Sequence, residues 1–511
     1  MLRKIRTILA GVFFVLITLL FLDFTGTMHH WLSWMAKIQF LPAVLALNVG
    51  VVVVLVLLTL LFGRIYCSVI CPLGVFQDVI ARLNRKKNKY SFSKALSWLR
   101  YTMLGVMVVA LVAGIGSVFQ LLAPYSAYGR IATMLFQPVW KAGNNILASI
   151  AEHVDSYAFY HVEQVAAVGA VMAIAVITFI VVSVLALRNG RTYCNTICPV
   201  GTVLSFFARF SFLKIRFDEE KCRNCSLCSK NCKAACIDYK THTVDYSRCV
   251  VCGNCISKCK FGALVYAHSV SPASGQVANN SRVEETQIDN GGGKTTTDKP
   301  DKGRRTFLLA TALVTTAVIA QEKKKVDGGL AKIEEKKMPA RKTPITPPGS
   351  LSAANMAKRC TGCQLCVSDC PNGVLRPSTS LISIMQPVMS YERGYCRPEC
   401  TRCSEVCPTG AIKPITREEK AETRIGQAVV IQENCLMVEK GVDCGNCARH
   451  CPAGAIELVQ IDESDENSPF VPSVDADRCI GCGACEHLCP VRPFSAIYVE
   501  GREVHSVRGE R

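Results

Sequence analysis

The spacing of the cysteines constrains this chain more than any other feature. Of its 511 residues, 29 are cysteine, and most of them fall into six groups of four. Two groups have the spacing C-x2-C-x2-C-x3-C, and they are Cys222, Cys225, Cys228 and Cys232, then Cys249, Cys252, Cys255 and Cys259. In the other four groups the last cysteine precedes a proline; they are Cys360, Cys363, Cys366 and Cys370; Cys396, Cys400, Cys403 and Cys407; Cys435, Cys444, Cys447 and Cys451; and Cys479, Cys482, Cys485 and Cys489.

This spacing is typical of iron-sulfur proteins. Three closely spaced thiolates wrap one 4Fe-4S cube, and the fourth cysteine crosses over to a neighbouring cube. The six groups therefore predict six 4Fe-4S clusters, held in small α+β ferredoxin-like domains. Disulfides and structural zinc are the alternatives for a cysteine-rich chain. Zinc modules usually need cysteine pairs separated by a longer gap, and soft thiolates suit iron-sulfur chemistry.

The first two groups should exchange their fourth cysteines. The resulting ligand sets are Cys222, Cys225, Cys228 and Cys259 for one cluster, and Cys249, Cys252, Cys255 and Cys232 for the other. Lys233 and Lys260 stand where the pattern usually has proline, and Cys236 is an additional cysteine that could replace Cys232. In the last four groups the spacing does not decide which groups exchange their fourth cysteines. The second and third of these have a wider first gap, so Cys396 and Cys435 are the ligands that the pattern supports least.

Apolar runs in the first 190 residues predict a membrane domain. About 20 apolar residues cross a bilayer core, and runs of this kind without a polar stripe occur at 7–24, 40–62, 101–123 and 165–187. We therefore expect a four-helix membrane bundle. Lys and Arg concentrate before the first run, between the second and third, and after the fourth, which predicts a cytoplasmic N terminus. The net charge of +18 fits this topology and anionic lipid, and no basic stripe interleaved with aromatics indicates nucleic-acid binding.

A repeated motif follows the second and fourth apolar runs. It reads GRIYCSVICPLG at 63–74 and GRTYCNTICPVG at 190–201, which indicates an internal duplication. Its cysteines are Cys67, Cys71, Cys194 and Cys198. They are expected to converge at the cytoplasmic membrane surface and to hold a seventh metal centre or cluster. A redox-active dithiol pair and a purely structural role remain the alternatives.

A polar linker, 269–302, separates the two cysteine-rich regions and is too poor in large apolar residues to fold. It precedes GRRTFLLATALVTTAVIA at 303–320, in which Arg304 and Arg305 come before a short apolar run. This resembles a twin-arginine export signal and would involve the twin-arginine translocation machinery. The alternative is a short helix in a chain that stays inside the cell. Cleavage after Ala320 and retention as a fifth span are both open.

These observations divide the chain into six segments. They are a membrane domain 1–217, a cytoplasmic two-cluster domain 218–268, the linker 269–302, the signal or fifth span 303–322, a second linker 323–349, and an extracytoplasmic four-cluster domain 350–511.

Both halves resemble subunits of the electron-transfer systems of periplasmic nitrate reductases. Residues 1–268, with the two GRxYCxxxCPxG copies, resemble the membrane ferredoxin-type subunit NapH. Residues 303–500 resemble the periplasmic ferredoxin-type subunit NapG, through the arginine pair, PPGSLSAANMAKRCTGC, RIGQAVVIQENCL and DRCIGCGACEHLCP. The resemblance implies a multi-pass protein of the bacterial inner membrane, with its C-terminal cluster domain in the periplasm. It also implies that the chain oxidises quinol from the membrane pool and passes electrons to an extracytoplasmic cytochrome or reductase.

Two other functions remain open. The chain could be an accessory or regulatory polyferredoxin for the assembly of a respiratory oxidase or reductase. It could also be an electron-transfer protein that receives its electrons from a cytoplasmic ferredoxin. The sequence assigns no catalytic residue, so an enzymatic role would be that of a quinol dehydrogenase component. Polar residues near the predicted membrane surfaces that could handle protons are Asp23, His29, His30 and Asp78, and each also fits an ordinary interfacial position.

Overall fold

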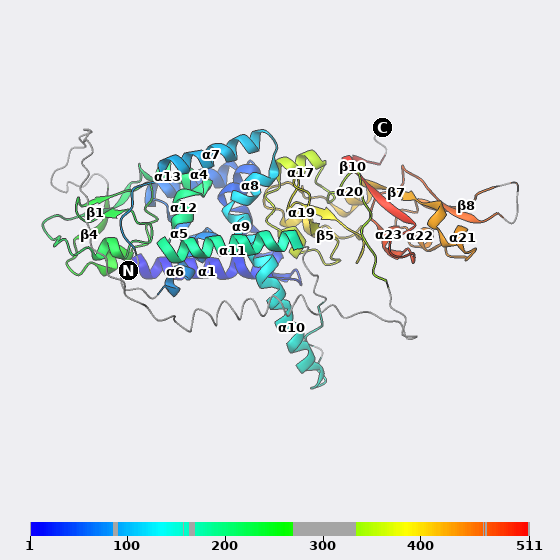
Figure 1. Cartoon of the computed structure of the whole chain (residues 1–511), viewed down its shortest axis with the longest axis horizontal. Helices are drawn as coiled ribbons and strands as arrows, with labels where there is room; N and C mark the ends of the chain where they lie inside the picture. The colour runs from blue at the N-terminus through cyan, green and yellow to red at the C-terminus, as the bar shows by residue number, and fades with distance from the viewer. Residues whose placement is uncertain are drawn as a thin grey trace, which may run out of the picture.

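The computed structural model describes residues 2–84, 90–156, 158–162, 169–268, 334–462, 464 and 468–508. The predicted linker 269–302 and the predicted signal 303–320 lie outside these residues. In the described part, a helix bundle is joined to two cysteine-rich domains that carry short two-stranded sheets (Figure 1).

Helices from the first half of the chain form the bundle. Their bounds are α1 (Leu2–Leu22), α2 (Thr27–Lys37), α3 (Phe40–Leu45), α4 (Val49–Phe62), α5 (Ile65–Val69), α6 (Pro72–Leu83), α7 (Ser97–Val112), α8 (Gly116–Leu122), α9 (Pro124–Ile131), the π-helix η1 (Ala132–Phe136), α10 (Gln137–Glu152), α11 (Gly169–Asn189), α12 (Thr192–Thr196) and α13 (Pro199–Ala208). Among the described helices, α1 and α11 are long and apolar enough to cross a membrane, over Arg3–Leu22 and Gly169–Asn189.

The apolar runs at 40–62 and 101–123 are each divided into two helices. Between α3 and α4, Leu47 has a left-handed φ of 56°, and the Asn48 side chain caps α4 by accepting a hydrogen bond from the Val51 amide. Between α7 and α8, Gly114 has a φ of 72°. Left-handed residues end a helix even where hydropathy is continuous. By helix length and composition, the structure thus supports two of the four predicted spans.

The first cysteine-rich domain, residues 213–268, lies at one end of the bundle, near the N terminus (Figure 1). Strand β1 (Leu213–Phe217) pairs antiparallel with β4 (Leu264–His268), so that Leu213 faces His268. Between them lie α14 (Leu227–Lys230), β2 (Ile237–Asp238), β3 (Thr243–Val244) and α15 (Asn254–Lys258).

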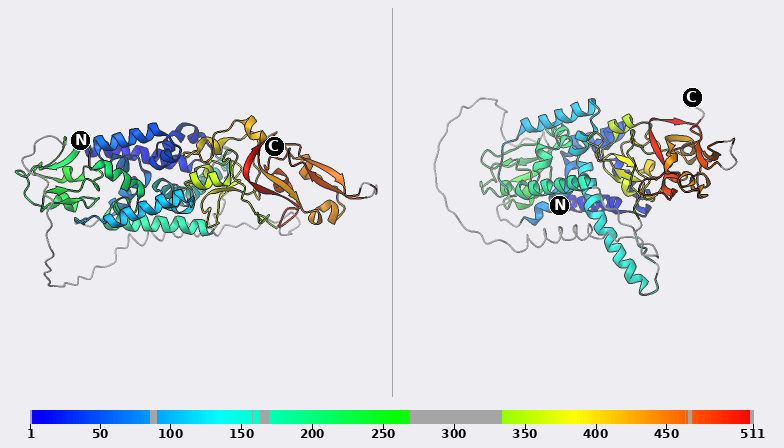
Figure 2. Two further views of the ribbon diagram at one scale, coloured as in Figure 1. Left: turned by 90° about the horizontal axis from the view of Figure 1, so that it is seen from above. Right: turned by 45° about the vertical axis from the view of Figure 1, so that its right-hand side comes forward.

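The second cysteine-rich domain, residues 334–508, lies at the opposite end of the bundle in all three views (Figures 1 and 2). Its elements are α17 (Ala353–Arg359), α18 (Leu365–Ser368), β5 (Leu375–Pro377), β6 (Pro387–Met389), α19 (Arg402–Val406), α20 (Arg417–Glu422), β7 (Thr423–Val430), η2 (Gln432–Asn434), α21 (Leu436–Glu439), α22 (Asn446–Arg449), β8 (Ile456–Gln460), β9 (Phe470–Val474), α23 (Ala484–Leu488) and β10 (Ile497–Val507). The antiparallel pairs are β5 with β6, β8 with β9, and β7 with β10.

The bundle and the second cysteine-rich domain are packed as one body. A continuous set of buried apolar side chains runs from Phe21 in α1 through Tyr125 in α9 to Met356 and Leu365. Burial of apolar surface is the main favourable term in such packing. The first cysteine-rich domain has a smaller core of its own, which includes Ile215.

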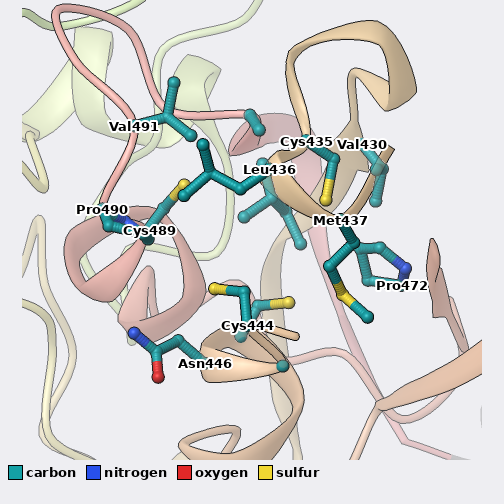
Figure 3. A pocket seen from close by; sticks show the side chains of 14 residues that line it. Val430, Cys435, Leu436, Met437, Cys444, Asn446, Pro472, Cys489, Pro490 and Val491 are labelled. Atoms are coloured by element: carbon teal, nitrogen blue, oxygen red, sulfur yellow. The ribbon is translucent and has the colours of Figure 1, made fainter. Parts of the chain in front are cut away.

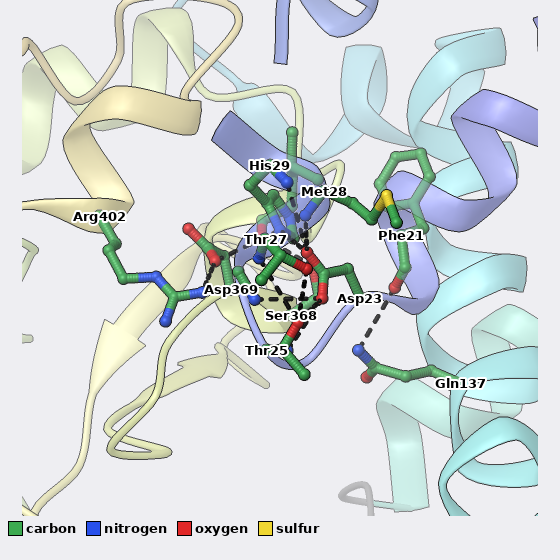
Figure 4. Close-up of polar contacts among 12 residues, drawn as sticks. Phe21, Asp23, Thr25, Thr27, Met28, His29, Gln137, Ser368, Asp369 and Arg402 are labelled. Atoms are coloured by element: carbon green, nitrogen blue, oxygen red, sulfur yellow. Dashed lines mark hydrogen bonds and ion pairs between the residues drawn. The ribbon is translucent and has the colours of Figure 1, made fainter. Parts of the chain in front are cut away.

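A buried polar cluster also joins these two parts (Figure 4). Nδ1 of His29 lies 3.0 Å from Asp23 and 3.3 Å from Asp369 of the second cysteine-rich domain, and Arg402 bonds to the same Asp369 carboxylate. His29 is 3% exposed and Asp369 is 2% exposed. Two of the polar residues singled out from the sequence, Asp23 and His29, therefore lie in a domain interface, whereas His30 is exposed.

Candidate iron-sulfur sites

The closely spaced cysteine groups share one local structure. In five of the six groups the chain turns through a left-handed residue and then forms a helix of four or five residues that carries the third cysteine. The left-handed residues are Ser226, Gly253, Gln364, Gly445 and Gly483, with φ between 55° and 81°. Such a turn aims successive cysteines at one point. In the second group of the second domain, the residue before α19, Thr401, instead has an ordinary φ of −111°.

Two cysteine-lined cavities show which of the last groups exchange cysteines. Figure 3 shows the first cavity, which is lined by Cys435, Cys444, Cys447 and Cys489. The second is lined by Cys451, Cys479, Cys482 and Cys485. Each cavity thus combines three cysteines of one group with the fourth cysteine of the other, as the crossover rule requires.

In the other two groups of the second domain, the fourth cysteine of each group likewise lies among the thiols of the other group. Burial raises the pKa of the Cys366 thiol, and the neighbouring thiols that raise it further are Cys363, Cys360, Cys407 and Cys403. Burial likewise raises the pKa of Cys403, and the neighbouring thiols are Cys396, Cys370 and Cys400. The two pairs of groups touch where the Cys396 amide donates to the Cys482 carbonyl at 2.9 Å. The structure therefore shows which groups lie next to each other, which spacing had left open.

In the first cysteine-rich domain, Cys232 lies with the second group. Burial raises the pKa of Cys255, with further contributions from Cys252, Cys232 and Cys249. The additional Cys236 is 1% exposed, and its sulfur lies 3.5 Å from that of Cys232. It occupies the position that holds Ala411 or Ala455 in other groups.

A 4Fe-4S cluster does not require four thiolates within reach of one ion. Among the described residues, no group of three or more His, Cys, Asp or Glu side chains could hold one metal ion. A cube binds its four thiolates on four separate irons, so they stand farther apart. Backbone amides also point at the sulfurs, as Gly362 does toward Cys360 at 3.4 Å and Ala455 toward Cys451 at 3.3 Å. Such donors stabilise a thiolate and tune a cluster.

The two copies of the repeated motif, at 63–74 and 190–201, are called the membrane-end motifs. They converge into a four-cysteine site, which consists of Cys67, Cys71, Cys194 and Cys198. Short helices α5 and α12 carry the first cysteine of each motif, and the second cysteine caps α6 or α13 directly before a proline. All four are 4% exposed. Burial raises the pKa of Cys198, and the thiols that raise it further are the other three members of the site.

Two arginines hold the motifs together reciprocally. Nη2 of Arg64 donates to the Cys194 carbonyl at 3.1 Å, and Nη1 of Arg191 donates to the Cys67 carbonyl at 2.5 Å. Both arginines are fully buried. This exchange gives the site approximate twofold symmetry. Sequence analysis did not single out these arginines, although each occupies the second position of its motif copy.

The glycine after each Cys-Pro pair makes this exchange possible. A Cβ atom on Gly74 would lie 2.2 Å from the Cys67 carbonyl oxygen and 2.6 Å from Arg191. A Cβ atom on Gly201 would lie 2.3 Å from the Cys194 oxygen and 2.7 Å from Arg64. Only a residue without a side chain allows this approach.

Asp78 is the buried anion beside the four-cysteine site. It lies 2.8 Å from Arg191, 3.0 Å from Arg6 and 3.2 Å from Lys233. Burial alone would raise its pKa, but these cations, Arg191 foremost, hold that pKa below its ordinary value. The carboxylate is therefore structural, and Lys233 of the first cysteine-rich domain, which replaces the usual proline, docks that domain onto the bundle.

Positive charge exceeds negative charge around the four cysteines. Together with Arg64, the cations around Asp78 outnumber it, and Nε of Arg64 and Nη2 of Arg191 have no hydrogen-bond partner among the described residues. Arg64 also lies 3.7 Å from the Cys67 sulfur, and Gln77 donates to the Cys194 sulfur at 3.2 Å. Buried cations need compensation, and four thiolates bound to a cluster would supply it. The residues therefore fit such a centre.

Family models for iron-sulfur domains match both halves of the chain. A model described as a 4Fe-4S binding domain matches residues 44–90 and again 168–217, once around each membrane-end motif. Another 4Fe-4S binding domain matches 242–265. Two 4Fe-4S dicluster domain models match 328–375, and 395–455 with 440–492. The chain therefore carries multiple 4Fe-4S binding domains, as the cysteine spacing predicted.

Curated relatives match the chain in part. The methylamine utilization ferredoxin-type protein MauM of Methylobacillus flagellatus is 33% identical over 218 residues, which cover 41% of this chain and 87% of the relative. The ferredoxin-type protein NapG of Escherichia coli is 33% identical over 206 residues, covering 37% and 83%. The ferredoxin-type protein NapH of Escherichia coli is 25% identical over 227 residues, covering 43% and 67%. No solved structure matches the chain.

Proposed function

Because this chain belongs to the family of ferredoxin-type iron-sulfur electron-transfer proteins that includes NapG and MauM, we propose that it oxidises quinol in the membrane. The electrons pass through 4Fe-4S clusters to an extracytoplasmic acceptor, a cytochrome or a reductase. The observation that carries the proposal is the position of the four-cysteine site, which is buried in the bundle where Arg64 and Arg191 bond to Ser247 and Lys233 of the first cysteine-rich domain.

Six clusters follow from the crossover arrangement. Their ligand sets are Cys222, Cys225, Cys228 and Cys259; Cys249, Cys252, Cys255 and Cys232; Cys360, Cys363, Cys366 and Cys407; Cys396, Cys400, Cys403 and Cys370; Cys435, Cys444, Cys447 and Cys489; and Cys479, Cys482, Cys485 and Cys451. Cys67, Cys71, Cys194 and Cys198 hold a seventh centre. Each cluster supplies one-electron chemistry when bound. The chain contributes the thiolates, excludes water by burial, and sets the local charge.

The proposed topology has four membrane spans. α1 and α11 are the first and fourth, and the divided pairs α3–α4 and α7–α8 are the second and third. The N terminus and the first cysteine-rich domain then lie in the cytoplasm, in line with the distribution of Lys and Arg. The second cysteine-rich domain lies in the periplasm of a bacterial inner membrane. Export of that domain, by a twin-arginine signal at 303–320, concerns residues outside the described part.

Anaerobic reduction by quinol tests this function. The reconstituted protein in detergent is mixed with menaquinol or ubiquinol while cluster absorbance is followed. The protein should contain about 28 irons per chain, or about 24 without the seventh centre, because each cluster has four irons. Addition of quinol should then reduce the clusters and lower their absorbance. Serine in place of Cys67 and Cys194 should remove the seventh centre only. If only dithionite or a reduced ferredoxin bleaches the clusters, quinol is not the donor. A cytoplasmic donor or an accessory role would then replace the proposal.

A further inference from the structure

Helices α8 and α9 connect the four-cysteine site to the nearest cysteine group of the second domain. Resting on the function proposed above, we infer that this connection, from Gly116 to Ile131, is the route by which an electron crosses between the two. One electron leaves the reduced four-cysteine centre and enters the oxidised cluster held by Cys360 and its partners. No bond or proton changes in this step.

The first link starts at the four-cysteine site. Tyr193 directly precedes Cys194, and its hydroxyl donates to the Leu122 carbonyl at the end of α8 at 3.1 Å. Tyr193 is buried, with 6% of its surface exposed.

The second link ends at the second cysteine-rich domain. Nε2 of Gln120 donates to the Cys360 carbonyl at 3.0 Å, a bond between residues 240 positions apart. α9 comes equally close, because a Cβ atom on Gly129 would lie 2.3 Å from the Cys363 carbonyl oxygen. The loop that carries two ligands of the proposed cluster thus rests on α8 and α9.

Arg130 fixes the geometry between these links. Its guanidinium is fully buried and donates to the carbonyls of Gln120 at 2.7 Å and Leu121 at 3.3 Å. Among the described residues, no carboxylate forms an ion pair with it. A buried guanidinium without a carboxylate is costly. Because it bonds to the carbonyl of Gln120, which in turn contacts Cys360, Arg130 acts as a positioning residue for the route.

The resulting path is almost entirely covalent. It runs from Cys194 to Tyr193, across one hydrogen bond to Leu122, back along the chain to Gln120, and across a second hydrogen bond to Cys360. Electron tunnelling through covalent and hydrogen bonds is faster than across van der Waals gaps. The four-cysteine site is therefore connected through covalent and hydrogen bonds to the second cysteine-rich domain as well as to the first.

Two variants on different elements test the route. Tyr193→Phe removes one hydroxyl, and Gln120→Leu removes one amide of similar volume. The control is Tyr128→Phe on α9, a residue outside the path from Tyr193 to Cys360, whose buried hydroxyl pairs with Thr18 at 2.5 Å. Proteoliposomes with the first domain facing outward receive dithionite, and freeze-quench electron paramagnetic resonance follows the reduction of clusters in the second domain. Redox titration and iron analysis accompany each variant.

Both variants should slow reduction of the second domain several-fold while midpoint potentials and iron content stay unchanged, and the control should match the unaltered protein. Unaltered rates in both variants would overturn the route. If one variant loses a cluster, the reduction rate of the other variant still tests the route. Failure of the proposed function has a different signature, because quinol would then reduce no cluster although dithionite still drives transfer at rates that depend on Tyr193 and Gln120.

Discussion

Asp78 offers the sharpest prediction at the scale of single residues. Asp78→Asn should leave three buried cations without their carboxylate, and breaking a buried ion pair in this way costs about 3–5 kcal/mol. Equilibrium unfolding in detergent micelles measures the loss. Because the pKa of Asp78 is lowered in the folded protein, its contribution is complete above the unfolded value of about 3.9 and fades only as pH falls below it. The difference should thus be constant between about pH 6 and 8.

The matched control for this change is Asp218→Asn. Asp218 is paired with Lys221 at 2.6 Å on the surface, where an ion pair contributes little, so no measurable loss is expected. Equal stability of the Asp78→Asn protein and the unaltered protein would contradict the role of Asp78 as the anchor of the first cysteine-rich domain.

The two motif glycines should behave alike. Gly74→Ala and Gly201→Ala each place a methyl group against a cysteine carbonyl and the opposite arginine, and overpacking of this kind costs about 1–3 kcal/mol. Both should lower the iron content attributed to the four-cysteine site and lower the melting temperature. Gly143→Ala in α10, where a Cβ meets nothing within 4 Å, is the control. A loss for one motif glycine but not the other would contradict the reciprocal arrangement.

At this scale the cysteine groups can be recognised in the sequence, whereas the residues around them cannot. Thiolate spacing is local, so it can be recognised in a single sequence. The exchange between Arg64 and Arg191, by contrast, joins residues in different motif copies, and only the folded bundle brings them together. Lys233 looked like a departure from the ferredoxin pattern until its contact with Asp78, far away in the sequence, explained it.

At the scale of elements, the crossover of cysteines between groups is directly testable. Cys489→Ser and Cys444→Ser should abolish the same cluster signal in electron paramagnetic resonance, because both side chains line one cavity. Cys451→Ser and Cys482→Ser should abolish a different signal. Cys236→Ser, in the first cysteine-rich domain, should leave both signals unchanged. If Cys489→Ser and Cys482→Ser instead removed the same signal, each group would supply its own fourth ligand.

The positions at which helices end were harder to predict from the sequence than the apolar runs themselves. The runs at 40–62 and 101–123 are apolar throughout, yet Asn48 and Gly114 divide them. At Asn48 and Gly114 the local backbone ends a helix although the surrounding residues are apolar. A hydropathy average over a window of residues does not detect this. The cluster loops were predictable because one turn geometry, with a left-handed residue before a short helix, recurs in five groups.

At the scale of the whole molecule, the two cysteine-rich domains are separated by the length of the bundle, and α1 and α11 run between them (Figure 1). The order of the two cysteine-rich regions along the chain can be read directly from the sequence. The sequence did not predict that the second half docks directly on the end of the bundle, because the contacts of His29 with Asp369 and of Gln120 with Cys360 depend on where each helix ends.

This separation predicts that the two domains lie on opposite sides of the membrane. A cleavage site for a specific protease is inserted between β2 and β3 in one protein and between β8 and β9 in another, since each position lies between the two strands of an antiparallel pair. In spheroplasts the protease should cut only the β8–β9 site, and in inverted vesicles only the β2–β3 site. Detergent should expose both and serves as the control for cleavage itself. Cleavage of both sites in the same sealed vesicles would place the two domains on one side, and α1 and α11 would then be core helices of a protein that does not span the membrane.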